Sequence, residues 1–329
     1  MIVGQDKAVA QFANAWASRK LHHAWLLAGP KGVGKASFAG TAARRLLADA
    51  AGPPLDMPGL DAPDDHPIVK LIAAGSHPDM RALQRLENEK TGNLNRNIKV
   101  EQIRDLGEFM SLTPALSDWR VAIIDTVDDL EAAAANALLK ILEEPPPNTI
   151  FFLVSHAPGR LLPTIRSRCR RLDFQGLEDD AMTSVLKAQA PQLSDAERGR
   201  IIAMAAGSAG RALGFAELDL ANLEDAAIAI LRHGDPTNAR RSALAGDLGK
   251  KAATERYAAF LDLAPSLIAR EARGLHGSSR ERALDAYGKA RELATLAPRL
   301  SLDPAATIFQ IGGILASVAE PAIAPSLKR

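Results

Sequence analysis

The sequence predicts an α/β fold in which a parallel sheet is covered by helices on both faces and is followed by an all-helical C-terminal half. Three observations predict it. Short apolar runs alternate with segments of helical period over the first half of the chain, a pattern typical of buried parallel strands. A glycine-rich loop of the phosphate-binding kind joins the first apolar run to a helix. Strand-like runs cease after about Phe174.

The elements follow in a regular order along the chain. We expect strands at Ala24–Ala28, Asp79–Leu86, Arg120–Asp125 and Thr149–Ser155, and a short one after Arg170. We expect helices at 5–19, from Gly34 to about Ala50, at Val100–Leu112 and at Leu130–Leu142, where E-E-P-P-P ends the last. The Pro-, Gly- and Asp-rich segment Ala51–Pro67 is expected to be an exposed loop.

Only helical patterns follow the last strand. Three short helices are expected over 178–218, and longer ones over 219–329, with breaks at Gly234–Pro236 and at Pro304. The predicted division is therefore a sheet domain at 1–175, a small helical domain at 176–218 and a larger helical domain at 219–329.

Composition excludes several classes of protein. A hydrophobic content of 47% in 329 residues indicates a folded core, and a net charge of +1 gives no global attraction to DNA. The single cysteine, Cys169, excludes a disulfide framework and a cysteine-based zinc site. The sequence has no apolar run of about 18 residues and no signal-peptide pattern at its start. We therefore expect a cytosolic protein without membrane contact.

The glycine-rich loop has the pattern G-x-x-x-x-G-K between a strand and a helix, which surrounds phosphate oxygens with backbone N–H groups. Its residues are Gly29, Gly32, Gly34 and Lys35. The next position normally carries a hydroxyl that binds Mg²⁺, but here it is Ala36. Ser37 lies about 100° further round the helix. We expect at most weak, largely Mg²⁺-independent binding of ATP, ADP or phosphate.

The position of Asp125 also indicates a nucleotide site with incomplete catalytic groups. The apolar strand that ends in Asp125 suits a residue that holds the water shell of Mg²⁺. Thr126 follows it and cannot act as a general base near neutral pH. Asp128 and Asp129 are interpreted as a solvated helix start rather than as a replacement for the base.

Three further motifs carry a family resemblance. Residues 136–140 (N-A-L-L-K) and 143–146 (E-E-P-P) resemble the N-A-L-L-K-x-L-E-E-P-P signature of subunits of the bacterial DNA polymerase III clamp loader, which are AAA+ proteins. Ser167, Arg168 and Cys169 resemble the S-R-C motif of that family, and Gly4 and Gln5 resemble the box that lies against adenine. The resemblance covers Ile2 to about Arg171. It implies a RecA-like AAA+ sheet domain, a helical lid and a helical collar domain that joins subunits.

Within this family the resemblance favours the non-hydrolysing delta-prime type of subunit. The S-R-C arginine of the family reaches into the ATP site of a neighbouring subunit, and Arg168 matches it. Motor subunits also carry an arginine in a G-S-x-R pattern, where this chain has Gly210 and places Arg211 one residue later. Together with Ala36 and Thr126, this implies a stator that supplies Arg168 in trans and performs no hydrolysis itself, as an accessory subunit of a DNA polymerase. The alternative for Arg168 is an ordinary surface arginine, and Cys169 is interpreted as a small core residue.

The resemblance also implies partners. These are the gamma/tau and delta subunits of the clamp loader, the sliding clamp indirectly, and primer–template DNA through the assembly. Arg96, Lys99 and Arg104, in the segment 93–104, are either close to DNA or part of a solvated face. The apolar segments Ala258–Leu267 and Ile308–Ala319 are either a subunit interface or ordinary helix core, and periodicity does not separate the two.

No metal or required cofactor is expected. Many members of the family carry a four-cysteine zinc module, but residues 50–76 contain no cysteine. The spacing of His66, His77, Asp64 and Asp65 fits no standard zinc pattern.

Two alternatives to the stator remain. One is an active ATPase of the gamma/tau type. The other is a different AAA+ protein, such as a helicase loader or branch-migration motor. Such a protein should lack the N-A-L-L-K-x-L-E-E-P-P signature together with the S-R-C motif.

Overall fold

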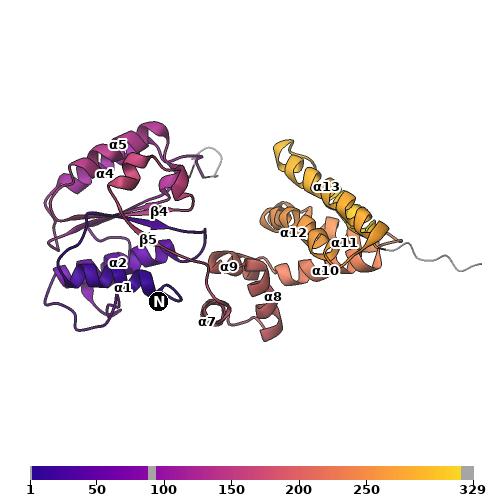
Figure 1. Ribbon diagram of the computed structural model, residues 1–329, viewed down its shortest axis with the longest axis horizontal. Coiled ribbons are helices and arrows are strands. Elements are labelled where there is room, and N and C mark those ends of the chain that lie inside the picture. Colours follow the sequence, from indigo (N-terminus) through magenta and orange to yellow (C-terminus); the bar gives the residue numbers. More distant parts are fainter. Residues whose placement is uncertain (1, 88–93, 320–329) are drawn as a thin grey trace, which may run out of the picture. The chain divides into compact units, whose positions relative to one another are not determined.

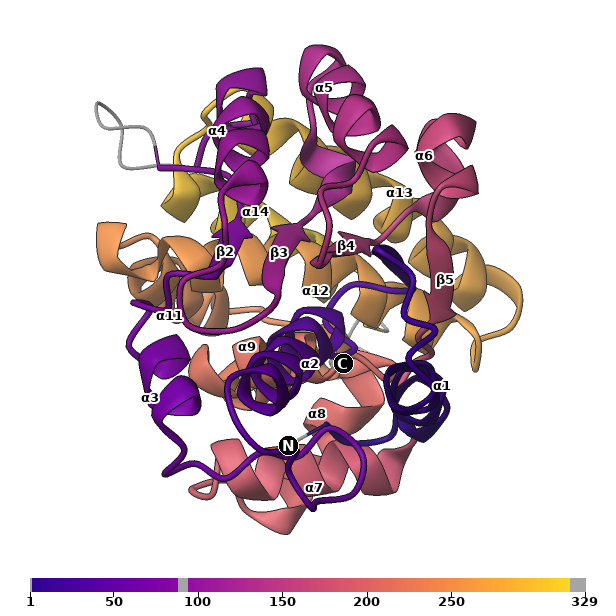
Figure 2. The same cartoon turned by 90° about the vertical axis from the view of Figure 1, so that its left-hand side faces the viewer.

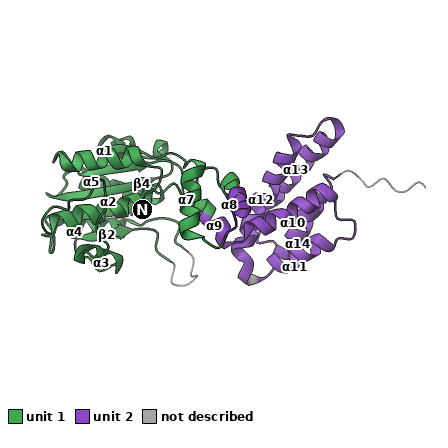
Figure 3. Cartoon of the chain, turned by 90° about the horizontal axis from the view of Figure 1, so that it is seen from below, with its two compact units in different colours: residues 1–192, 202–212 green, residues 193–201, 213–329 purple. Residues whose placement is uncertain are grey.

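The computed structural model describes residues 2–87 and 94–319, and the chain divides into two compact units (Figure 3). Unit 1 comprises residues 1–192 and 202–212, and unit 2 comprises residues 193–201 and 213–329. The boundary between the units therefore runs through the segment 178–218, which the sequence pattern assigns to one small helical domain. The division into three domains stays a prediction.

Unit 1 is built on a five-stranded parallel sheet, which confirms the predicted fold class (Figure 2). The strands are β1 (Ala24–Ala28), β2 (Met80–Leu83), β3 (Arg120–Asp125), β4 (Thr149–Ser155) and β5 (Arg170–Asp173). Their order in the sheet is β2-β3-β4-β1-β5. Every residue of β1 and β4 is buried, as expected for strands with helices on both sides.

Two layers of helices cover the sheet (Figure 1). The helices of this unit are α1 (Asp6–Ala17), α2 (Lys35–Ala50), α3 (Pro67–Ala73), α4 (Val100–Ser111), α5 (Ala132–Glu143), α6 (Pro163–Ser167) and α7 (Asp179–Gln189). On one face Phe12 of α1 and Phe38 of α2 pack in one core with Trp25. On the other face Leu138 of α5 packs in one core with Leu26. Successive side chains of a strand point to opposite faces, so β1 contributes to both cores.

Two elements differ from the sequence prediction. β2 covers Met80–Leu83 rather than 79–86, because it is an edge strand whose middle residues are exposed. α3 is a helix that the sequence pattern did not indicate. It has seven residues, too few for a clear helical period. Pro67 occupies its first turn, and Nδ1 of His66 accepts a hydrogen bond from the N–H of Ile68 at 3.3 Å.

The segment 51–66 is held by a buried arginine. Arg45 of α2 donates hydrogen bonds at 2.8 Å to the carbonyl oxygens of Leu55, Met57 and Asp61. Its Nε also lies 2.9 Å from Oδ2 of Asp49. Within residues 2–87 and 94–319, no group of three or more His, Cys, Asp or Glu residues could hold a metal ion. Hydrogen bonds from Arg45, and one from the Leu55 N–H to Asp49 Oδ1 at 2.8 Å, therefore hold this loop against α2.

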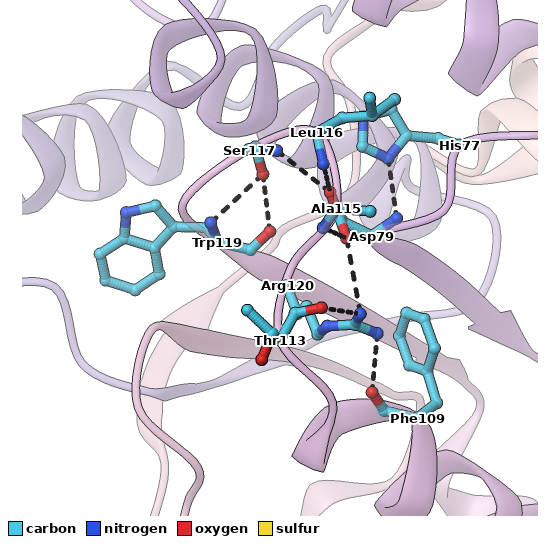
Figure 4. Close-up of polar contacts among 9 residues, drawn as sticks. All are labelled: His77, Asp79, Phe109, Thr113, Ala115, Leu116, Ser117, Trp119 and Arg120. Carbon is cyan, nitrogen blue, oxygen red and sulfur yellow. Dashed lines mark hydrogen bonds and ion pairs between the residues drawn. The ribbon is translucent and has the colours of Figure 1, made fainter.

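A second buried cluster fastens the loop before β3 to the start of β2 (Figure 4). Asp79 is fully buried. Its carboxylate accepts hydrogen bonds from the backbone N–H groups of Ala115 and Leu116 at 2.7 Å and of Ser117 at 3.1 Å. Nδ1 of His77 accepts the N–H of Asp79 at 3.1 Å, and burial lowers the pKa of His77.

Arg120 completes the cluster around Asp79. Its guanidinium is buried, lies 3.7 Å from the Asp79 carboxylate and packs over the ring of Phe109. It also donates hydrogen bonds to the carbonyl oxygens of Phe109 at 2.7 Å and Thr113 at 2.6 Å. The cluster thus ties the end of α4, the following loop and two strands together at one edge of the sheet.

Unit 2 is helical in its described part. Its helices are α10 (Leu220–His233), α11 (Ala239–Leu248), α12 (Thr254–Ala272), α13 (Gly277–Arg299) and α14 (Pro304–Ala316), and α8 (Asp195–Ala205) and α9 (Ala209–Glu217) cross the boundary between the units. The predicted breaks near Gly234 and Pro304 are present. Phe260 and Leu261 of α12 and Ile308 and Ile311 of α14 are buried in one core, so both apolar segments are at least helix core. A subunit interface there stays a prediction.

One further property concerns membranes. Across the described ranges, no helix is long and apolar enough to cross a bilayer.

Candidate functional site

The phosphate loop, residues Gly29–Lys35, joins the carboxyl end of β1 to α2. Gly34 caps α2 with a φ of +96°, and Gly32 has a φ of +78°. Residues with side chains rarely adopt such φ values. The predicted glycines therefore shape a turn that leads into a helix N-terminus, as a phosphate cradle requires.

Lys35 is turned toward its own loop. The side chain is buried, and Nζ donates hydrogen bonds to the carbonyl oxygen of Gly29 at 2.6 Å and to that of Pro30. Burial lowers the pKa of Lys35 to about 8, against the opposing effect of Asp125 and Asp128. A phosphate would have to draw this ammonium group away from two carbonyl partners.

Residues 207–211, here called the lid segment, lie directly on the phosphate loop. Oγ of Ser208 donates to the carbonyl oxygen of Lys31 at 2.9 Å, and the N–H of Gly210 donates to that of Gly32 at 2.8 Å. A Cβ atom added to Gly210 would lie 3.0 Å from Cα of Gly32. The absence of a side chain at position 210 thus allows the two backbones to touch. Arg211 is exposed.

The start of the chain closes the other side of the loop. The side-chain amide of Gln5 donates to the carbonyl oxygen of Val33 at 3.1 Å and to that of Gln175 at 2.9 Å. A Cβ atom on Gly4 would lie 2.8 Å from Leu177 Cδ2. Gly4 and Gln5 therefore lie beside the phosphate loop, but their proposed role against an adenine stays a prediction.

The carboxylates after β3 have partners of their own. Burial raises the pKa of Asp125, against the effects of His156 and Lys35. Asp128 accepts hydrogen bonds from Oγ of Ser155 at 2.8 Å and from the N–H of His156. Asp129 lies 3.2 Å from the guanidinium of Arg85. Both Asp128 and Asp129 are therefore engaged by partners within the chain.

Two positions differ from the pattern expected of a nucleotide-hydrolysing site. Ala36 follows Lys35 in α2 and has no hydroxyl, and Ser37 is exposed. Thr126 follows Asp125 and is buried. Sequence reasoning missed His156, which approaches Lys35 and Asp125 from the end of β4 and whose pKa is lowered by burial and by Lys35. The sheet places the end of β4 beside the end of β3, and a single sequence gives no direct signal of this adjacency.

Arg168 lies apart from these groups, just after α6. Its Nη2 is 2.7 Å from Oε1 of Glu143 at the end of α5, and its Nη1 donates to the carbonyl oxygen of Thr164 at 3.0 Å. The side chain is 32% exposed. Ser167 also bonds the Thr164 carbonyl, at 3.1 Å. In the described part of the chain, Arg168 makes no contact with the phosphate loop.

Cys169 is largely enclosed. It packs against the core between the sheet, α4 and α5, and burial raises the pKa of its thiol to about 12. The thiolate is the nucleophilic form of cysteine. At neutral pH Cys169 is therefore an unreactive packing residue.

The predicted basic residues within the described part of the chain are exposed. Asn93 lies outside the described residues, whereas Arg96, Lys99 and Arg104 are all exposed. Arg104 lines a groove of about 630 Å³ between α4 and α5. Lys140 and Asn136 of the N-A-L-L-K motif line the same groove, and neither was predicted to lie beside Arg104. Contact with DNA at these residues stays a prediction.

Comparisons with known proteins agree on one family. The family model described as "DNA polymerase III, delta subunit" matches residues 4–178. The chain is 42% identical over 150 residues to the delta-prime subunit of DNA polymerase III from Pseudomonas aeruginosa, a match to 45% of this chain and 41% of that protein. It is 32% identical over 235 residues to the tau subunit from Bacillus subtilis, covering 68% of this chain and 39% of that protein. These matches thus span about two fifths of each relative.

A solved structure shows the same fold. It is that of a DNA polymerase III gamma subunit-related protein from Thermotoga maritima, with a TM-score of 0.50, 17% identity, and coverage of 92% of this chain and 97% of that one. At this identity the likeness concerns the fold alone.

Proposed function

Because the chain belongs to the DNA polymerase III delta subunit family of clamp-loader proteins, as its match over residues 4–178 shows, we propose that it is a non-hydrolysing stator of the delta-prime type. In this role it helps to load the sliding clamp onto primed DNA during replication. The observation that carries the proposal is the contrast between an accessible Arg168 and a nucleotide site that lacks catalytic groups.

The chain's own site supports the absence of hydrolysis. Ala36 provides no hydroxyl for Mg²⁺, and Thr126 provides no carboxylate to activate water. Lys35 is engaged by carbonyl groups of its own loop. Gly210 offers no side chain at the position where motor subunits of the family sense the γ-phosphate.

Arg168 supplies a positive charge to the ATP site of a neighbouring subunit. Transfer of the γ-phosphoryl group spreads negative charge over its equatorial oxygens, and a fixed guanidinium stabilises that charge. Arg168 follows the last residue of α6, its side chain is 32% exposed, and its guanidinium contacts Glu143 of α5 and the Thr164 carbonyl of α6. Its cation is therefore accessible to a phosphate presented by another protein.

The partners follow from this role. They are gamma/tau motor subunits, one of which receives Arg168, and the delta subunit. The clamp is contacted indirectly, and primer–template DNA is held by the assembly as a whole in the cytoplasm. Arg96, Lys99 and Arg104 would face this DNA through sequence-independent, salt-sensitive phosphate contacts.

A second candidate is an active motor of the gamma/tau type, which the long match to the tau subunit favours. Steady-state ATP turnover by the purified chain separates the two. We expect no turnover above background, because the metal ligand and the base are both missing. Lys35→Ala, prepared in parallel, measures contaminating ATPase. Turnover in the wild-type chain that is lost in this variant would establish the motor instead.

Any residual nucleotide binding should depend on pH. Lys35 is charged below its pKa of about 8 and neutral above it, so its attraction for phosphate is present at pH 7 and lost by pH 9. We expect the affinity for ATP without Mg²⁺, measured by calorimetry, to fall by about tenfold over this interval. Lys35→Arg, which stays charged throughout, should remove the dependence. An equal fall in both proteins would mean that another group titrates.

A further inference from the structure

We infer that Glu143 is a positioning residue for Arg168: it holds the partly exposed guanidinium in one arrangement before a neighbour's phosphate arrives. This inference rests on the proposed function, because it assumes that Arg168 acts in trans. It goes beyond that function by assigning a role to a carboxylate in a different motif, 25 positions before the arginine in the sequence.

The geometry leaves Arg168 both held and available. Glu143 Oε1 binds Nη2 at 2.7 Å, and the Thr164 carbonyl binds Nη1 at 3.0 Å. A guanidinium has five N–H donors in a rigid plane, so two hydrogen bonds leave others free for a phosphate. With 32% of the Arg168 side chain exposed, the guanidinium remains accessible to a phosphate from outside.

The local fold fixes the carboxylate. Glu143 is the last residue of α5, and the prolines at 145 and 146 prevent the helix from continuing. α5 and α6 contact each other (Figure 2), and Leu142 and Ile165 lie in the same core. The negative end of the α5 dipole also favours a cation at this place.

The benefit is a lower entropic cost of ordering a long side chain. Arginine loses much rotamer freedom when it is fixed in an interface, and Glu143 and Thr164 impose part of that loss in advance. The pair is partly exposed, with 32% of the Arg168 side chain and 49% of the Glu143 side chain accessible, so it adds little to folding stability. Removal of Glu143 should therefore affect turnover by the neighbour but leave the fold unchanged.

The test uses the full chain reconstituted with gamma/tau and delta subunits. For Glu143→Ala we expect the kcat of DNA-stimulated ATP hydrolysis at the site that receives Arg168 to fall by about 2- to 10-fold. The KM for ATP should not change, because the arginine acts on the transition state. Glu143→Gln, which keeps an acceptor oxygen, should recover part of the rate. Glu144→Ala is the matched control, because Glu144 is an adjacent exposed carboxylate without an ion pair in the described part of the chain.

A double variant identifies the route of the effect. If Glu143 acts only through Arg168, Glu143→Ala should have no further effect in an Arg168→Ala background. An unchanged or faster rate for Glu143→Ala, or an additional fall in the double variant, would overturn this inference while Arg168→Ala still reports the proposed function. An Arg168→Ala rate equal to wild type would instead overturn the proposed function itself. Size-exclusion chromatography confirms that each variant enters the assembly.

Discussion

Replacing Arg168 with alanine is expected to lower the ATP hydrolysis rate of the neighbouring subunit's site by about 10³- to 10⁵-fold, the usual contribution of such an arginine. The developing charge on the γ-phosphate would lose the cation that Glu143 and the Thr164 carbonyl hold in place. The measurement is the DNA-stimulated ATP turnover of the reconstituted assembly. Its total rate should fall by the fraction that the site receiving Arg168 contributes.

The control for this experiment is a neighbouring arginine in α6. Arg166 of α6 is exposed and has no ion pair within the described ranges, so Arg166→Ala removes an equal charge two residues away. It should leave turnover near the wild-type value. Arg168→Ala should also fold and assemble normally, because its exposed contacts are worth about 0–1 kcal/mol. Equal turnover in the Arg168→Ala and wild-type assemblies would exclude the stator role.

Replacing Asp79 with alanine is expected to lower the free energy of unfolding of unit 1 by about 3–5 kcal/mol. Three backbone N–H groups would lose their acceptor, and the buried guanidinium of Arg120 would lose its carboxylate. Urea unfolding followed by tryptophan fluorescence measures this, because Trp16, Trp25 and Trp119 all lie in unit 1.

An exposed ion pair provides the comparison. Asp173 lies 2.6 Å from Arg171, and both side chains are more than half exposed, so Asp173→Ala should cost no more than about 1 kcal/mol. If Asp79→Ala were as mild as Asp173→Ala, the cluster in Figure 4 would not be a main support of the sheet.

The elements that sequence predicts best are the buried strands. β1, β3 and β4 have the predicted bounds, because a wholly apolar run between polar or turn-forming residues has few alternatives in an aqueous fold. β2 and α3 are harder to predict from sequence. An edge strand keeps exposed positions that disrupt its apolar pattern, and a seven-residue helix completes only two turns.

The site residues, too, include some that sequence predicts and some that it does not. The loop glycines and Lys35 are adjacent in sequence, so one motif predicts them together. The contact between Ser208 and Lys31 joins residues separated by 177 positions, and the pair of Glu143 and Arg168 joins two motifs. Such contacts depend on how helices pack onto the sheet, and a single sequence without an alignment carries no direct signal of that packing.

The contact between Gly32 and Gly210 restricts the side chains that position 210 can carry. Any side chain at position 210 would crowd the Gly32 backbone and weaken the hydrogen bond that closes the loop. On the proposed function, an arginine placed at position 210 would therefore act as a phosphate sensor only if residues 207–211 moved away from the phosphate loop.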